Sequence, residues 1–385
     1  MLVTFNFNVP PTLVFGVDTV NQTGQYVKKL GGKRAFIVTD PGVAKAGILE
    51  KVIDILKSDG IEVGYYDQVI PEPPENIVDE IVDKVKEGGY EVIIGLGGGS
   101  SMDTAKMVAV LVTNGGRVRD YIGIGKVPKP GLPKIMIPTT SGTGSEVTQI
   151  AIFALLEEEV KKGVVSPYLL AEVAIVDPAL TYNLPPNITA STGMDALVHA
   201  IEAYLSRRAN KFTDGLALMA MELIAKNIRT AVTDGMNTEA RYNMSLGSLI
   251  AGIAFGNSST GAVHALAYPL GGQFRIPHGV ANTLMLPYVM EYNLVSRMER
   301  FVKIAEALGE KVDGLPVREA AFKAIDAMVN IAKDIGVPMR LRDVNIPKEA
   351  IPKMAAAAIN ETRLLSQNPR VLTLKDIEDI YNKAW

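Results

Sequence analysis

Residues 91–106 read Glu91-Val-Ile-Ile-Gly-Leu-Gly-Gly-Gly-Ser100-Ser-Met-Asp-Thr-Ala-Lys106. The apolar run at residues 91–94 is typical of a buried strand, and residues 101–112 are typical of a helix. A glycine loop joins the two segments. A strand, a loop and a helix in this order form the unit from which α/β folds are built, so we expect this fold class.

Further strand and helix patterns precede this stretch in the first half of the chain. Short β-rich runs at residues 35–38 and 61–66 are followed by helical spacing at residues 43–56 and 77–85. Repeated alternation of this kind predicts a parallel sheet covered by helices. Additional strand candidates are residues 134–137, 147–155 and 173–176.

The pattern changes after Pro185-Pro186, where helical runs dominate and few β-rich segments remain. We therefore expect an α/β domain at residues 1–184 and an all-helical domain at residues 185–385. A chain of 385 residues is long enough for two domains of ordinary size. The helices predicted in the second domain are residues 189–207, 212–233, 239–255, 259–270, 278–292, 300–308, 318–335 and 374–383.

The composition excludes several classes of protein. With 48% hydrophobic and 21% charged residues, the chain has an ordinary globular composition. Its net charge of −3 provides no basic surplus to bind phosphate backbones, so we expect no nucleic-acid partner. The absence of cysteine excludes disulfides, iron–sulfur clusters, Cys-ligated zinc and thiol nucleophiles.

Targeting and membrane segments are not recognised in the sequence. Residues 1–11 lack the cationic and apolar regions of a signal peptide. Apolar runs stay shorter than the ~18 residues that a membrane span needs. We therefore expect a cytoplasmic protein without a membrane partner.

The glycine loop at residues 95–101 is a candidate phosphate-binding site. Glycines let the backbone approach a ligand closely, and a helix start offers unpaired N–H groups and a positive dipole end. Read as G-x-G-x-x-G, however, the pattern fails at Ser100 and follows the third predicted strand rather than the first, so the dinucleotide fingerprint is half met. The alternative is a tight strand–helix turn with Asp103 as a helix-start carboxylate.

Two further polar positions follow predicted strands. Residues 138–146 carry hydroxyls and glycines suited to lining the same cleft, because open parallel sheets bind ligands at the carboxyl ends of their strands. Asp40 follows the strand at residues 35–38, where a carboxylate accepts hydrogen bonds from a ribose 2′-OH and repels a 2′-phosphate, which favours NAD over NADP. The alternatives are a solvated loop and an aspartate that starts the turn at Pro41-Gly42.

All three histidines occur in contexts that suit a metal site. Asp195 and His199 lie four residues apart on a predicted helix and therefore emerge on one face. Between His264 and His278, the sequence Pro269-Leu-Gly-Gly272 should turn the chain so that the two side chains converge. One carboxylate and three imidazoles suit Fe²⁺, or Zn²⁺ as the alternative. The competing interpretation is that the histidines are ordinary core or surface residues.

The order and spacing of four motifs resemble those of the iron-containing, group III alcohol dehydrogenases over essentially the whole chain. Residues 374–381 also look like the last helix of that family. The four motifs are Gly97-Gly-Gly-Ser-Ser-Met-Asp-Thr-Ala-Lys106, Pro138-Thr-Thr-Ser-Gly-Thr-Gly-Ser-Glu146, Thr192-Gly-Met-Asp-Ala-Leu-Val-His-Ala-Ile-Glu202, and His264-Ala-Leu-Ala-Tyr-Pro-Leu-Gly-Gly272 with Pro277-His-Gly-Val-Ala-Asn282.

The resemblance implies a nucleotide-binding domain with a parallel, Rossmann-like sheet, an all-helical metal-binding domain and an active site between them, which is the dehydroquinate-synthase-like fold. It implies that Asp40 sets a preference for NAD and that Lys162 reaches the cofactor ribose. It assigns Asp195, His199, His264 and His278 to the metal, Gly97, Gly98, Gly99, Ser100, Ser101, Met102 and Asp103 to the pyrophosphate, Thr139, Thr140 and Ser141 to the cofactor, and Phe255 with Ile150 to the substrate pocket.

Tyr268 departs from the family pattern. Many members carry a histidine at this position, near the nicotinamide, with a role in proton relay. A tyrosine has an ordinary pKa near ~10 and is a poorer relay at neutral pH. Three alternatives follow: the proton leaves through ribose hydroxyls and water, the substrate class has changed, or Tyr268 packs beside the cofactor.

We therefore expect an NAD-dependent, metal-dependent alcohol dehydrogenase or aldehyde reductase for short primary alcohols or diols, with hydride transfer between the metal-bound substrate and the nicotinamide. The family suggests a homodimer. One alternative is a dehydroquinate-synthase-like lyase or synthase, which we disfavour because Arg275 is the one obvious cation near the predicted ligands. The others are a dehydrogenase of polyols or functionalised aldehydes and a catalytically silent binding protein.

Overall fold

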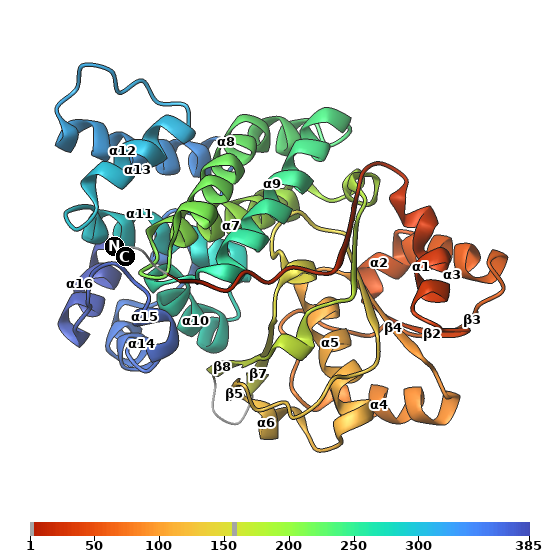
Figure 1. Ribbon diagram of the computed structural model, residues 1–385. Coiled ribbons are helices and arrows are strands. Elements are labelled where there is room, and N and C mark those ends of the chain that lie inside the picture. Colours follow the sequence, from red (N-terminus) through yellow and green to blue (C-terminus); the bar gives the residue numbers. More distant parts are fainter. Residues whose placement is uncertain (1–3, 156–159) are drawn as a thin grey trace. The chain divides into compact units, whose positions relative to one another are not determined.

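The computed structural model describes residues 4–155 and 160–385, and contacts divide the chain into two compact units. One unit comprises residues 8–183, and the other comprises residues 184–385 together with residues 4–7. Figure 1 shows strands and helices in the first unit and helices in the second. The assignment of two domains at residues 1–184 and 185–385 stays a prediction.

The first unit is built on a six-stranded sheet with the strand order β1-β9-β6-β4-β2-β3. All five neighbouring pairs in this sheet are parallel, which confirms the predicted α/β class. The edge strand β1 was missed by the sequence patterns. The strands are β1 (Thr12–Phe15), β2 (Arg34–Val38), β3 (Glu62–Tyr66), β4 (Val92–Gly97), β6 (Lys134–Pro138) and β9 (Val173–Val176).

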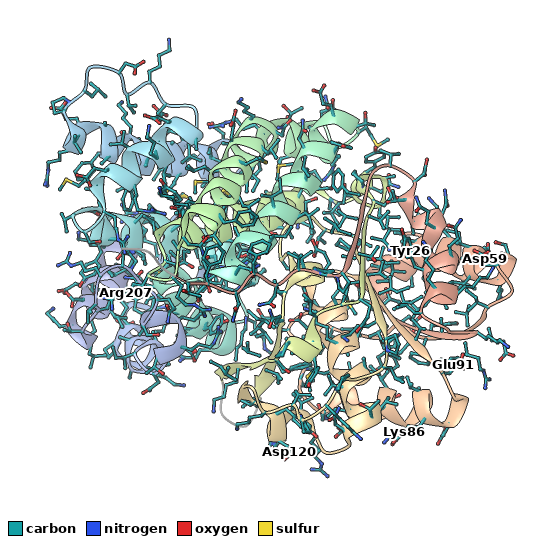
Figure 2. All side chains as sticks on the ribbon, viewed as in Figure 1. Tyr26, Asp59, Lys86, Glu91, Asp120 and Arg207 are labelled. Atoms are coloured by element: carbon teal, nitrogen blue, oxygen red, sulfur yellow. The ribbon has the colours of Figure 1, made fainter. Side chains whose placement is uncertain are left out.

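Alternate residues of β4 enter two different cores. Val92, Ile94 and Leu96 pack on one face of the sheet and Ile93 packs on the other, because side chains alternate along a strand. Both faces are covered by helices, as is usual for parallel sheets. Exposed charged residues such as Lys86 lie outside these cores (Figure 2). The first core includes α1 (Thr23–Lys29) and α3 (Ile48–Ser58), and the second includes α4 (Ile77–Gly88) and α5 (Gly99–Asn114).

Two predicted elements differ in the structure. The helix predicted at residues 43–56 is divided into α2 (Pro41–Lys45) and α3, because Gly47 between them adopts a φ of 75°. The strand predicted at residues 147–155 begins only at Ile150. As β7 (Ile150–Leu155), it pairs antiparallel with β8 (Val160–Val165), which also pairs with β5 (Gly123–Ile124) in a separate three-stranded sheet.

The second unit contains all eight helices that the sequence predicts, within a few residues of their expected ends. α7 packs against α8, α9 and α11 and is buried over most of its length, so it carries apolar residues on nearly all sides. None of the helices in the described ranges has the length and apolar content needed to cross a membrane. The helices are α7 (Pro186–Leu205), α8 (Lys211–Thr233), α9 (Thr238–Asn257), α10 (Ala262–Phe274), α11 (His278–Leu294), α12 (Met298–Ala307), α13 (Val317–Asp334), α16 (Leu374–Ala384), and two that were not predicted, α14 (Ile351–Ala358) and α15 (Thr362–Leu365).

Candidate functional site

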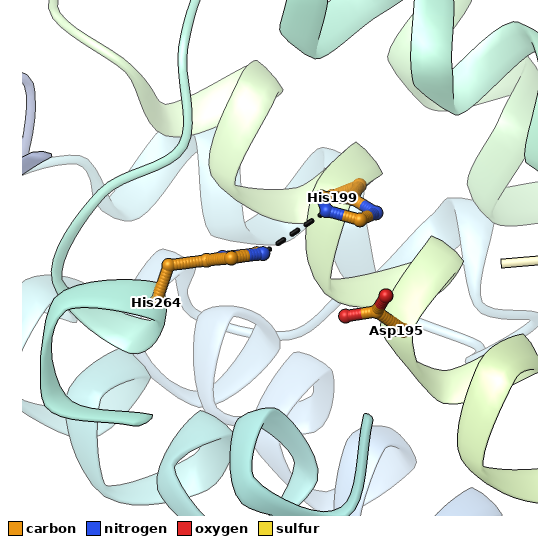
Figure 3. A group of neighbouring side chains, drawn as sticks. All are labelled: Asp195, His199 and His264. Atoms are coloured by element: carbon orange, nitrogen blue, oxygen red, sulfur yellow. Dashed lines mark hydrogen bonds between the residues drawn. The ribbon is translucent and has the colours of Figure 1, made fainter. Parts of the chain in front are cut away.

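Three of the four predicted metal ligands lie together in the helical unit. Asp195 and His199 project from α7 and His264 projects from α10, as Figure 3 shows. One donor atom of each residue lies within 4.8 Å of the others, and all three side chains are buried. The helical repeat places Asp195 and His199 one turn apart on the same face, whereas His264 joins them through the packing of the unit.

The two imidazoles of this group present the same ring nitrogen to each other. His199 Nε2 lies 3.0 Å from His264 Nε2. The His199 ring also stacks on Phe255, with ring centroids 4.2 Å apart. Phe255 was predicted to line the substrate pocket, and the structure places it directly behind a predicted ligand.

His278 lies beside this group but less deeply. Its Nε2 atom is 3.8 Å from Asp195 Oδ1, and its side chain is 32% exposed. The ring of Tyr268 lies 6.1 Å from the His278 ring, so this residue is also close to the histidines. A catalytic role for Tyr268 stays a prediction.

Asn282 occupies the middle of the cluster, although it was given no role from the sequence. Its Nδ2 donates to Asp195 Oδ1 over 2.6 Å and lies 3.2 Å from Nε2 of both His264 and His278. Its Oδ1 is buried without a hydrogen-bond partner in the part of the chain that the structure describes. The signal available in the sequence was its position one helical turn after His278.

The charge state of Asp195 suits a cation. Burial disfavours the charged carboxylate, but the imidazoles of His199, His278 and His264 and the Asn282 amide together hold the pKa of Asp195 below its ordinary value. A buried carboxylate that stays ionised requires a compensating positive charge. The cluster therefore has the donor set and the charge that a divalent metal ion needs.

The predicted cofactor loops meet at one edge of the parallel sheet. Three adjacent parallel strands, β2, β4 and β6, end at this edge. Asp40 follows β2, the glycine loop follows β4, and Thr139 follows β6. Thr139 N donates to Gly97 O over 3.0 Å. Gly97 has a φ of 146°, and a Cβ there would lie 2.7 Å from Ser101 Oγ, so this position requires glycine.

The start of α5 has the features of an anion site. Gly98 is the N-cap residue and supplies no side chain to bind the first N–H groups of the helix. A Cβ on Gly98 would be 3.8 Å from Thr140, and Thr140 Oγ1 is buried without a hydrogen-bond partner among the described residues. Both predicted loops thus present polar groups around Gly98.

Asp40 caps α2 in the structure. Its Oδ1 accepts hydrogen bonds from Gly42 N and Val43 N, and its Oδ2 accepts one from Ser101 Oγ over 3.1 Å. This is the turn-starting aspartate that the sequence offered as an alternative. The carboxylate nevertheless lies next to the glycine loop, so its effect on the cofactor stays a prediction.

Asp103 and Met102 turn inward rather than toward the loop surface. Met102 is fully buried. Asp103 accepts hydrogen bonds from Ser145 Oγ over 2.6 Å and from Ile152 N over 2.9 Å. The fully buried Lys106 donates to Ser145 Oγ over 2.7 Å and to Ile150 O over 2.8 Å. This buried network connects α5 to β7 and to the loop at residues 138–146, which we call the polar loop. A cofactor role for Asp103 stays a prediction.

The remaining predicted residues are divided between the units. Ser141 is buried in the polar loop, and Lys162 lies partly buried on β8, paired with Phe153 of β7. Ile150 begins β7 in the first unit, whereas Phe255 belongs to the helical unit. Their roles in binding cofactor and substrate stay predictions.

Glu146 should make the stability of the protein depend on pH. Burial raises the pKa of its carboxyl to about 7, although Lys106 lowers it in part. In the unfolded chain the pKa is near 4.5, so the contribution of Glu146 is fully present below pH 4.5 and is lost as the pH rises through 7. Between pH 5 and pH 8, we expect the free energy of unfolding to fall by up to about 3 kcal/mol less in Glu146→Gln than in the wild type. Urea unfolding of the metal-free proteins at the two pH values measures this difference. Identical changes with pH in the two proteins would contradict the prediction.

Comparisons with known proteins place the chain among dehydrogenases. Residues 10–178 match the family model described as iron-containing alcohol dehydrogenase, and residues 189–385 match the model of the C-terminal part of the Fe-containing alcohol dehydrogenase family. Long-chain-alcohol dehydrogenase 1 of Geobacillus thermodenitrificans is 43% identical, over 98% of this chain and 95% of the relative.

Two solved structures are similar over nearly their full length. The crystal structure of a 1,3-propanediol oxidoreductase has a TM-score of 0.97 and 40% identity, with 100% of both chains covered. The sulfoacetaldehyde reductase of Bifidobacterium kashiwanohense, solved in complex with NAD⁺, has a TM-score of 0.90 and 31% identity, with 100% of this chain and 99% of that chain covered.

Proposed function

The chain belongs to the iron-containing alcohol dehydrogenase family, and from this we propose that it oxidises short primary alcohols or diols reversibly to aldehydes, with NAD⁺ as the hydride acceptor. The observation that carries the proposal is the convergence of Asp195, His199 and His264 in one buried group. We propose His278 as the fourth ligand, since its Nε2 lies 3.8 Å from Asp195 Oδ1.

The side chains present fit a divalent cation. They combine a buried carboxylate, imidazole nitrogen donors and the Oδ1 of Asn282, which has no hydrogen-bond partner among the described residues. The family description favours Fe²⁺, and Zn²⁺ remains the alternative because the same donors suit both ions. When bound, the ion would supply Lewis-acid chemistry to the substrate oxygen. The protein contributes the buried position and the orientation of the four ligands.

For the cofactor, we propose that the backbone at Gly97–Ser101 binds the pyrophosphate, because the start of α5 offers N–H groups beside glycines. Thr139, Thr140 and Ser141 would add polar contacts from the neighbouring loop, and Lys162 would reach the ribose. Relatives named for alcohol dehydrogenation and aldehyde reduction favour a dehydrogenase over the lyase or synthase alternative.

The decisive experiment is an anaerobic assay with C2–C4 alcohols, diols and aldehydes, and with longer alcohols, after the apoprotein has been loaded with Fe²⁺ or Zn²⁺. NAD(H) and NADP(H) are compared in parallel. We expect net NADH formation from primary alcohols or diols and its loss after chelation. Metal-loaded protein that bound NAD⁺ but produced no net NADH with any of these substrates would contradict the proposal.

Asp40 is proposed to favour NAD over NADP. Asp40→Ser keeps a side chain that caps α2 but removes the negative charge beside Ser101. We expect the ratio of kcat/KM with NADP⁺ to that with NAD⁺ to rise about tenfold, because one repulsive charge pair near a protein surface is worth about 1–4 kcal/mol. Asp54→Ser, an exposed position on α3, is the control. An unchanged cofactor ratio in Asp40→Ser would refute this role.

A homodimer is also proposed. β1 stands at the end of the strand order, and Leu13 on it is 44% exposed. An edge strand of this kind is a ready surface for pairing with a second chain. The molar mass of the full chain in solution tests this proposal, and the cytoplasmic location stays a prediction.

A further inference from the structure

Glu202 touches His264 from the side opposite to the metal cluster. It lies on α7, three residues after His199, and both Glu202 and His264 are 3% exposed. Its Oε2 lies 2.6 Å from His264 Nδ1, and its Oε1 accepts a hydrogen bond from Val263 N over 2.7 Å. One carboxylate therefore contacts both the ring of His264 and the backbone just before it.

The hydrogen bond determines which nitrogen of His264 carries its proton. An ionised carboxylate only accepts hydrogen bonds, so Nδ1 of a neutral imidazole must be the donor. Nε2 then keeps its lone pair. Nε2 is the atom that lies 3.0 Å from His199 Nε2 and 3.2 Å from the Asn282 amide, inside the cluster.

The second oxygen of Glu202 orients the start of α10. Gly261 precedes this helix and has no side chain with which to cap it. The Glu202 carboxylate caps the helix instead, because it accepts the hydrogen bond from Val263 N. Its negative charge also interacts favourably with the positive end of the helix dipole. Asn368 Oδ1 accepts from Ala262 N over 3.4 Å beside it. The ring and the backbone of His264 are thus oriented together.

We propose that Glu202 is a positioning residue for the metal centre, which holds the proton of His264 on Nδ1 and aims Nε2 at the metal. The inference rests on the proposed function, because it requires a metal to bind among Asp195, His199 and His264. Acceptors of this kind behind a ligating histidine typically change metal affinity by 10–100-fold when they are removed.

Glu202→Gln separates this role from simple helix capping. Its amide has nearly the size of the carboxylate and can still accept from Val263 N, but it then presents N–H groups to His264 Nδ1. That ring must shift its proton to Nε2 to avoid two facing donors, which blocks the metal-binding nitrogen. Glu222→Gln is the matched control, because Glu222 is exposed on α8 in an ion pair with Lys226.

The experiment measures metal binding rather than turnover. Apoproteins are titrated with Zn²⁺ against a chromophoric chelator and with Co²⁺ by visible absorption. We expect one ion per chain for the wild type and for Glu222→Gln. We expect a 10–100-fold higher Kd and an altered Co²⁺ spectrum for Glu202→Gln. Wild-type affinity and an unchanged spectrum in Glu202→Gln would overturn the inference and leave the proposed function intact, whereas a wild type that bound neither ion would overturn the proposed function itself.

A second measurement needs no variant. The chain has only three histidines, so ¹⁵N NMR of the labelled wild-type apoprotein can report their tautomers separately. We expect His264 to carry its proton on Nδ1. A proton on Nε2 would overturn the inference even if Glu202→Gln failed to fold.

Discussion

Replacing Asp195 with alanine is expected to abolish metal binding and to lower kcat/KM for alcohol oxidation by about 10³-fold. Asp195 is the only carboxylate among the three buried candidate ligands, so its removal takes away the negatively charged donor of the group. The Lewis-acid contribution of a metal is worth several kcal/mol, and each 1.36 kcal/mol corresponds to a tenfold change in rate.

The measurement compares metal content, thermal unfolding and activity in the same preparations. Added metal should raise the unfolding temperature of the wild type, because an ion that binds only the folded state stabilises it. It should leave that of Asp195→Ala unchanged. Asp54→Ala, which removes an exposed carboxylate from α3, should behave as the wild type. Full metal content together with full activity in Asp195→Ala would show that the reaction does not use this centre.

Replacing Lys106 with methionine is expected to lower the free energy of unfolding of the full chain by about 3–5 kcal/mol. The ammonium group is fully buried and lies 3.5 Å from Asp103 Oδ1, in addition to its hydrogen bonds to Ser145 and Ile150. Methionine keeps most of the apolar volume but leaves Asp103 without its buried cation. The polar loop loses an anchor as well, so KM for NAD⁺ should rise.

The loss in Lys106→Met should become smaller as the pH falls. Burial raises the pKa of Asp103 and that of Glu146, so both carboxyls take up protons and no longer need the cation. Urea unfolding at pH 5 and pH 8 measures this. Adding Asp103→Asn should recover part of the stability, since the unpaired charge is then removed. Lys226→Met, in an exposed pair, serves as the control, and an equal effect of the two lysine variants would disprove the argument.

Sequence patterns predicted the structure correctly where the residues that form the pattern lie within one helix or loop. The helical spacing of apolar residues located the eight helices of the second unit that were predicted, and the i, i+4 relation paired Asp195 with His199. The glycine loop was also recognised, because its residues are consecutive. These features depend on contacts between neighbours in the chain, and periodicity reports them directly.

Sequence patterns did not predict which strands and helices contact each other. Residues 147–155 looked like one more strand, yet β7 pairs antiparallel in a separate sheet with β8. The family resemblance assigned Asp103 to the pyrophosphate, and no pattern predicted its hydrogen bonds to Ser145 and Ile152, which lie 42 and 49 residues away. Periodicity measures how apolar a face is and does not identify its partner.

The amino-acid sequence alone was enough to predict the fold class and the family resemblance, and it singled out three residues that the structure brings together in one buried group. Glu202, which lies behind His264, and Asn282, which lies among the candidate ligands, emerged only from the tertiary structure. Glu202 reaches His264 across 62 residues, and Asn282 reaches Asp195 across 87. The physical reason is that α11 packs against both α7 and α10, which brings these side chains within hydrogen-bonding distance, and no short-range pattern records such a contact.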